Sequence, residues 1–130
     1  MQTKRTRHAV YNIAYHLVWC PKYRRPVLTD EVAQRLDELI HEQVKALKGD
    51  VIALEIQPDH VHLFAEFPPT LAVRQIMHRL KGHTSHELHN EFDWLNSRLP
   101  SLWTRSYYVG TAGNVSAETI RQYIEAQSGR

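Results

Sequence analysis

Residues 51–67 read VIALEIQPDHVHLFAEF, and this stretch carries the clearest sign of the fold class. Residues 51–57 and 60–67 are two short runs rich in branched and aromatic side chains, a composition typical of strands. Pro58 and Asp59, which separate the runs, are residues that favour turns. The stretch therefore predicts a β-hairpin. If residues 58–59 form a two-residue loop, they also set the register of the two strands.

The segments before this hairpin predict one strand and one helix. Residues 8–20 alternate between two sets of side chains and indicate a long strand that Pro21 ends. After a loop, Thr29 can cap a helix, which Gly49 terminates. The apolar residues expected on its packed face recur at helical spacing: Val32, Leu36, Leu39, Ile40, Val44 and Leu47.

The segment after the hairpin predicts a second helix. Pro68 and Pro69 break the second strand, and Thr70 is a plausible cap for a helix that reaches about Asn90. Residues 92–102 show no regular pattern and are expected to be irregular.

The C-terminal part predicts a short strand and a final helix. Residues 106–109 have strand character, and Gly110 and Gly113 are expected to form a flexible joint. Ser116 can cap a last helix that covers about 116–128.

The predicted order of elements is strand, helix, strand, strand, helix, strand and helix. Without the last helix, that order is the split βαβ pattern of ferredoxin-like folds. We therefore expect an α+β fold with an antiparallel sheet, helices on one face, and an added C-terminal helix. A length of 130 residues suits a single domain, 1–130.

Composition narrows the classes of protein further. The apolar runs are too short to span a bilayer, and no signal sequence is visible, so we expect a cytoplasmic protein without a membrane segment. The single cysteine, Cys20, can form no internal disulfide and is expected to be a small buried side chain.

The basic residues are clustered, although the net charge is only +2. Such clusters can bind phosphates and, with an aromatic residue beside them, stack bases. For any one of these residues, an ordinary solvated charge is an equal alternative. The candidates for DNA binding are Lys22, Tyr23, Arg24, Arg25, Arg74, Arg79 and Lys81.

His60 and His62 are candidate metal ligands because alternate residues of a strand point to the same face. If the hairpin loop has two residues, Glu55 lies opposite His62 and could orient it or join the metal shell. The alternative is that both histidines are polar residues on the wet face of a half-buried strand.

Tyr123 and Gln127 are four residues apart, so they share one face of the expected last helix. Two imidazoles and one amide oxygen would suit Mn²⁺ or Mg²⁺ better than a structural zinc. The alternative is that Tyr123 docks the helix onto the sheet and that Gln127 is solvated.

Taken together, these segments resemble the single-tyrosine HUH transposases of bacterial single-strand insertion sequences. The matching pieces lie in family order and cover nearly the whole chain. They are YHLVWCPKYRR at 15–25, PDHVHL at 58–63, RLKG at 79–82, LW at 102–103, SY at 106–107 and YIEAQ at 123–127.

The resemblance implies a role for each site residue. His60 and His62 would be the HUH histidines, Gln127 the third ligand of a divalent ion (Mg²⁺ or Mn²⁺), and Tyr123 the nucleophile. Gln57 and Phe64 depart from the residues that are usual in the family, and we expect these departures to affect packing rather than chemistry.

The implied activity is cleavage and rejoining of single-stranded DNA at insertion-sequence ends, through a 5′-phosphotyrosine intermediate. The implied partners are single-stranded DNA with subterminal hairpins and a second copy of the chain, in a homodimer that can exchange tyrosine helices. Two alternatives stay open: a domesticated or replication-initiator-like single-strand nickase, and a ferredoxin-like module that binds nucleic acid without catalysis.

Overall fold

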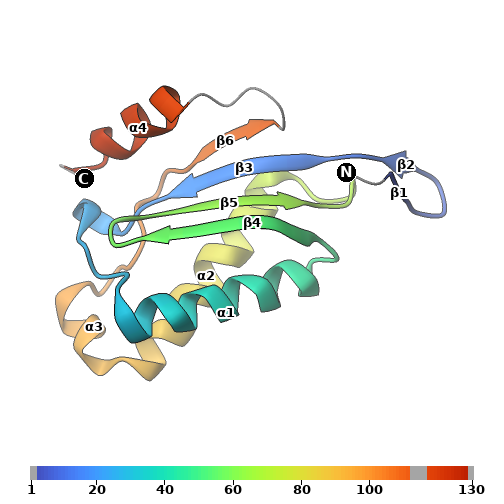
Figure 1. Ribbon diagram of the computed structural model, residues 1–130. Coiled ribbons are helices and arrows are strands. Elements are labelled where there is room, and N and C mark those ends of the chain that lie inside the picture. Colours follow the sequence, from blue (N-terminus) through green and yellow to red (C-terminus); the bar gives the residue numbers. More distant parts are fainter. Residues whose placement is uncertain (1–2, 112–116, 129–130) are drawn as a thin grey trace.

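The computed structural model describes residues 3–111 and 117–128 (Figure 1). Its strands and helices follow the predicted order, except that β1 and α3 are added and the predicted first strand is divided in two. In chain order they are β1 (Lys4–Arg5), β2 (Val10–Tyr11), β3 (Ala14–Trp19), the 3-10 turn η1 (Lys22–Arg24), α1 (Asp30–Ala46), β4 (Asp50–Gln57), β5 (His60–Glu66), α2 (Val73–Glu91), α3 (Asp93–Arg98), β6 (Tyr108–Thr111) and α4 (Ala117–Ala126).

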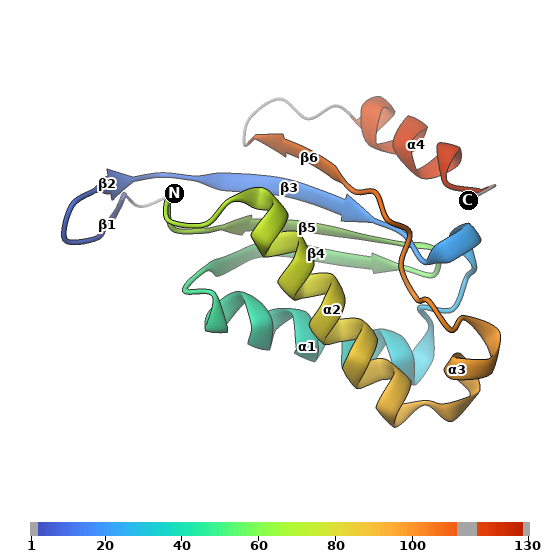
Figure 2. The same ribbon diagram turned by 180° about the vertical axis from the view of Figure 1, so that it is seen from behind.

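The central sheet has four strands in the order β4-β5-β3-β6, and each neighbouring pair is antiparallel. With α1 between β3 and β4 and α2 between β5 and β6, this is the ferredoxin-like split βαβ arrangement. Helices α1 and α2 cover one face, whereas α4 lies over the other face, next to β6 (Figures 1 and 2). The predicted fold class is confirmed.

The register of the β4-β5 hairpin agrees with a two-residue loop. Gln57 pairs with His60, and Glu55 pairs with His62. Because side chains alternate along β5, the register places Val61 and Leu63 in the core and leaves the two histidines on the opposite face.

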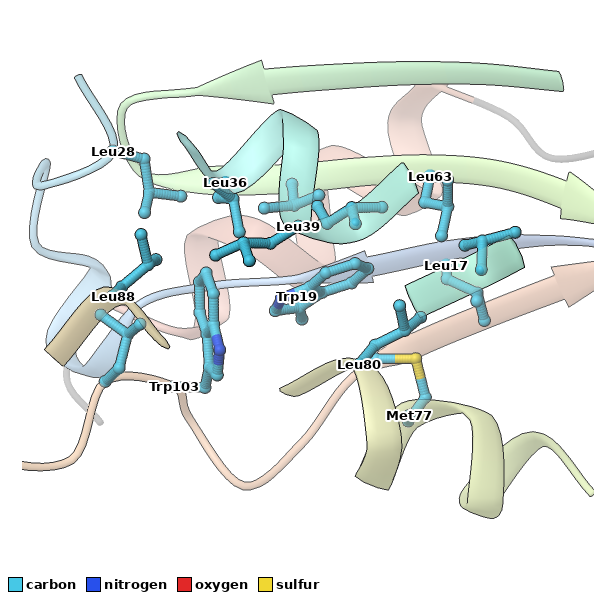
Figure 3. Close-up of a cluster of buried hydrophobic side chains, with 14 of the residues drawn as sticks. Leu17, Trp19, Leu28, Leu36, Leu39, Leu63, Met77, Leu80, Leu88 and Trp103 are labelled. Atoms are coloured by element: carbon cyan, nitrogen blue, oxygen red, sulfur yellow. The ribbon is translucent and has the colours of Figure 1, made fainter. Parts of the chain in front are cut away.

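The main core lies between the sheet and the helices α1 and α2, and the helical apolar spacing in α1 explains how that helix packs. The five buried residues within α1 are Val32, Leu36, Leu39, Ile40 and Val44, all of them predicted. Figure 3 shows Trp19 and Trp103 among the leucines of this core, with their rings edge to face and 6.0 Å apart. Cys20 is fully buried, and burial raises the pKa of its thiol to about 12.

Gly49, which follows α1, is the position at which the chain needs a glycine. A Cβ atom added there would lie 2.5 Å from the backbone oxygen of Glu66 and 2.9 Å from Cδ1 of Phe67. The connection between α1 and β4 can therefore pass against the end of β5 only without a side chain.

Several predicted boundaries were wrong. The predicted long N-terminal strand is divided into β2 and β3. Helix α2 begins after Ala72 and not after Thr70, and the N–H of Ala72 donates to the side chain of Gln75. The stretch expected to be irregular contains the short helix α3. Its N-cap residue, Phe92, makes no side-chain hydrogen bond to the helix, so the usual sequence signal of a helix start is missing.

The predicted glycine joint is wrong at Gly110, which lies within β6 and pairs with His16. Gly113 and Ser116 lie outside the described residues. In the described part of the chain, no helix is long and apolar enough to cross a membrane.

Candidate active site

His60 and His62 open into a pocket of about 490 Å³ between the β4-β5 hairpin and α4. The hairpin side of the pocket is polar, whereas α4 contributes two isoleucines as well as two charged residues. Besides the histidines, the lining residues are Arg24, Glu55, Asp59, Ile120, Arg121, Ile124 and Glu125. The pocket therefore joins the predicted metal-binding strand to the predicted tyrosine helix.

The ring of His60 is held by the turn residue before it. Its Nδ1 lies 2.9 Å from Oδ1 of Asp59, while Nε of Arg24 lies 2.9 Å from Oδ2 of the same carboxylate. A carboxylate can only accept, so neutral His60 keeps its proton on Nδ1 and has its lone pair on Nε2.

His62 has a partner that sequence reasoning missed. Its Nε2 lies 3.0 Å from Nδ1 of His16 on the neighbouring strand, and the His16 ring stacks on Phe64 at 4.1 Å. Burial, and secondarily the nearby His16, lowers the pKa of His62, so this imidazole is neutral at pH 7, as a metal ligand must be. Burial also lowers the pKa of His16. The alternation of residues 10–19 could have placed His16 on a face, but not opposite the hairpin.

The donor set fits a divalent cation. Two imidazoles on one strand and a carboxylate, Glu55, directly opposite His62 are ligand types that Mn²⁺ and Mg²⁺ accept, and Asp59 supplies the outer partner that metal-bound histidines usually have. Within the described residues, no three His, Cys, Asp or Glu side chains are grouped closely enough to hold a metal by themselves. A further ligand of another type, such as an amide oxygen, would therefore be needed.

Tyr123 lies on α4 and Gln127 directly follows the helix; their side chains are on the same side, as predicted, and both contact Ser106. The Ser106 hydroxyl lies 3.0 Å from the Tyr123 hydroxyl and donates to Oε1 of Gln127 at 3.1 Å. Gln127 is 3% exposed, and its Nε2 donates to the carbonyl of Tyr123. Neither side chain is among those that line the histidine pocket, because the isoleucine face of α4 is turned toward it.

The basic candidates lie in three different surroundings. Arg24 is engaged with Asp59, whereas Tyr23 and Arg25 are exposed beside it, and the Lys22 ammonium lies 5.9 Å from the Tyr23 ring. On α2, the Lys81 ammonium donates to the backbone carbonyls of two residues just before β6.

Arg74 lines a pocket of about 250 Å³ with Arg105 and Tyr107, on the α2 side of the molecule. Arg79 lines another hollow beside Arg74. A basic surface therefore exists on α2 as well as in the loop after β3, although Lys81 also has a structural role that its sequence position did not indicate.

The ferredoxin-like sheet, with a histidine pair on the face toward a C-terminal helix that carries a tyrosine, agrees with the class of tyrosine-dependent DNA transposases. The family of IS200-like transposases matches residues 9–127. The chain belongs to this family, and it is a DNA transposase enzyme.

Individual relatives agree with this assignment. The chain is 35% identical to the ISDra2 transposase TnpA of Deinococcus radiodurans, over 98% of this chain and 92% of that protein. It is 32% identical to the transposase of insertion sequence element IS200 of Salmonella typhimurium, over 95% of this chain and 82% of the relative.

Solved structures show the same fold. A crystal structure of a protein from Deinococcus radiodurans R1 has a TM-score of 0.90 and 33% identity, covering 98% of this chain and 99% of that chain. A REP-associated tyrosine transposase bound to a REP hairpin shares the fold alone, with a TM-score of 0.61 and 14% identity, over 95% of this chain and 69% of that chain.

Proposed function

We propose that this transposase cleaves and rejoins single-stranded DNA at insertion-sequence ends through a 5′-phosphotyrosine intermediate on Tyr123. His60, His62 and Gln127 are the proposed ligands of a divalent ion, Mg²⁺ or Mn²⁺. The observation that supports this most directly is the pocket in which an oriented histidine pair faces the helix that carries the tyrosine. The ion would polarise and orient the scissile phosphate.

The proposed reaction is a transesterification. The phenolic oxygen of Tyr123 forms a bond to phosphorus as the bond to the 3′ oxygen breaks, and the 3′ oxygen leaves as a hydroxyl. The phenol loses its proton in this step; its ordinary pKa of about 10 means that it needs an acceptor. Rejoining is the reverse, in which a 3′ hydroxyl attacks the phosphotyrosine, so no nucleotide cofactor is required.

The geometry sets one requirement on α4. In the described chain, Tyr123 and Gln127 are bonded to Ser106 on the side of α4 next to β6, so both must leave Ser106 before they can reach the histidines. We propose that the chain acts as a cytoplasmic homodimer of single domains, 1–130, in which α4 can be supplied by either copy.

The proposed substrate is single-stranded DNA that carries subterminal hairpins. Exposed Tyr23 and Arg25, with Lys22 beside them in the loop after β3, are suited to contact phosphates and bases. Arg74, Arg79 and Lys81 form the second proposed DNA contact, on α2.

The proposal is tested by incubating the protein with Mn²⁺ and single-stranded oligonucleotides that contain such hairpins, followed by a denaturing gel. We expect a covalent protein–DNA adduct with the wild type and none with Tyr123→Phe. Tyr108→Phe is the matched control, because its ring lies 6.3 Å from that of Tyr123, and it should retain the adduct.

Each other outcome has a meaning. An adduct that persists in Tyr123→Phe rules out Tyr123 as the nucleophile. Binding without any adduct favours a non-catalytic module, and cleavage without strand joining favours a nickase.

A further inference from the structure

We infer that Arg24 is a positioning residue of the metal site rather than a DNA contact: through Asp59 it holds His60 with Nε2 presented to the pocket. The inference deepens the proposed function, because it rests on the proposal that His60 binds a divalent ion. It separates the roles of two adjacent arginines that the sequence alone does not distinguish.

The two carboxylate oxygens of Asp59 contact two different side chains. Nδ1 of His60 donates to Oδ1 at 2.9 Å, and Oδ2 lies 2.9 Å from Nε of Arg24 in an ion pair. The side chains of Arg24, Asp59 and His60 are 31%, 26% and 19% exposed, so the row of contacts is partly shielded from water. Because each oxygen of Asp59 has its own partner, the orientation of the carboxylate is restricted. The hydrogen bond from Nδ1 in turn restricts the orientation of the His60 ring.

The backbone directs Arg24 toward this position at some cost. Tyr23 and Arg24 have φ angles of 60° and 52°, in the left-handed region that residues other than glycine seldom adopt. The turn is anchored on both sides: the N–H of Lys22 donates to the carbonyl of Leu102 at 2.7 Å, and that of Leu28 donates to the carbonyl of Pro58 at 3.0 Å. The second bond ties the chain beyond Arg24 directly to the hairpin loop that contains Asp59.

Arg25 provides the contrast. It is exposed, and among the described residues no carboxylate forms an ion pair with it. Its guanidinium is therefore available to a phosphate, whereas that of Arg24 is already paired with the carboxylate of Asp59 through Nε. Arg24 does line the histidine pocket, but it faces the carboxylate there.

The first test uses metal-free protein, so that it does not depend on activity. Imidazole ¹⁵N NMR should show His60 with its proton on Nδ1 in the wild type and in Arg25→Ala, and a mixture of tautomers in Arg24→Ala. Arg24→Lys, which keeps a cation near Asp59, should restore most of the wild-type signal.

The second test measures Mn²⁺ binding to the same proteins by electron paramagnetic resonance. We expect Arg24→Ala to weaken binding about tenfold or more, since loss of an outer partner of a metal ligand typically costs ~10–100-fold. Arg25→Ala should bind Mn²⁺ as the wild type does. If Arg24→Ala fails to fold, as judged by circular dichroism, Arg24→Lys and Asp59→Asn carry the comparison.

The third test measures the affinity for a hairpin oligonucleotide in EDTA by fluorescence anisotropy. Arg24→Ala should leave this affinity unchanged, whereas Arg25→Ala should reduce it. The inference is overturned if Arg24→Ala has wild-type Mn²⁺ affinity and His60 tautomer, or loses as much DNA affinity in EDTA as Arg25→Ala. A wild type that binds no Mn²⁺ would instead overturn the proposed metal dependence, so the two failures are distinguishable.

Discussion

At the scale of single residues, Ser106 contacts both Tyr123 on α4 and Gln127 just after it. The Gln127 amide donates from Nε2 to the Tyr123 carbonyl, so its Oε1 faces Ser106 and accepts the one proton of that hydroxyl. The Tyr123 hydroxyl must then be the donor in its 3.0 Å contact with Ser106. A single serine therefore holds both the proposed nucleophile and the proposed third metal ligand.

We predict that Ser106→Ala loosens α4 without affecting the core. The change removes two hydrogen bonds and leaves Oε1 of Gln127 buried without that donor, which typically costs ~1–3 kcal/mol. Hydrogen–deuterium exchange should become faster in α4 and stay unchanged in α1. Ser101→Ala, at an exposed position, is the control, and unaltered exchange in α4 would show that Ser106 does not hold the helix.

At the scale of elements, the connection between α1 and β4 depends on the missing side chain of Gly49. The chain there passes so close to β5 that a Cβ would meet a backbone oxygen, which cannot move aside as a flexible side chain can. By contrast, Gly82 lies within α2, and a Cβ atom added there would have no neighbouring atom within 4 Å. The packing around Gly82 therefore does not require a glycine.

We predict opposite effects for two glycine-to-alanine substitutions. Gly49→Ala should lower the free energy of unfolding by about 1–3 kcal/mol because it overpacks this junction. Gly82→Ala should raise it by up to about 1 kcal/mol because alanine favours the helix. Urea unfolding of the two variants and the wild type measures both changes in the free energy of unfolding. Equal effects of the two substitutions would show that Gly49 is not specifically required by the packing.

At the scale of the whole molecule, Lys81 joins α2 to the segment that leads into β6 and on to the tyrosine helix. Its ammonium donates to the carbonyls of Thr104 and Ser106. Burial lowers the pKa of Lys81 from 10.5 to about 8, an effect that nearby Cys20 opposes. The charged form is thus less favourable in the folded protein than in the unfolded chain.

This pKa shift predicts a pH dependence of stability. Between about pH 8 and 10.5 the unfolded chain binds more protons than the folded one, so this residue makes the free energy of unfolding rise with pH in that window. Below pH 8 its unfavourable contribution is fully present. Denaturant unfolding at pH 7.5 and pH 10 should show a larger gain for the wild type than for Lys81→Met, and equal gains would contradict the shift.

The sequence by itself determined the features that depend on neighbours along the chain. The Pro58-Asp59 turn sets the register of the hairpin, which brings Glu55 opposite His62 and puts the two histidines on one face. The apolar spacing in α1 specifies its buried face, and the four-residue spacing puts Tyr123 beside Gln127. Alternation and helical periodicity are local properties of the backbone, so they can be inferred from the residues alone.

The tertiary structure alone decided the partners of those residues. His16 and His62 are 46 positions apart, and they meet because β3 pairs with β5. Ser106 meets Tyr123 because α4 lies over β6, and Arg24 reaches Asp59 because the loop after β3 closes on the hairpin. Side-chain contacts between distant segments depend on how whole elements pack, and one residue of shift would exchange the faces of a strand.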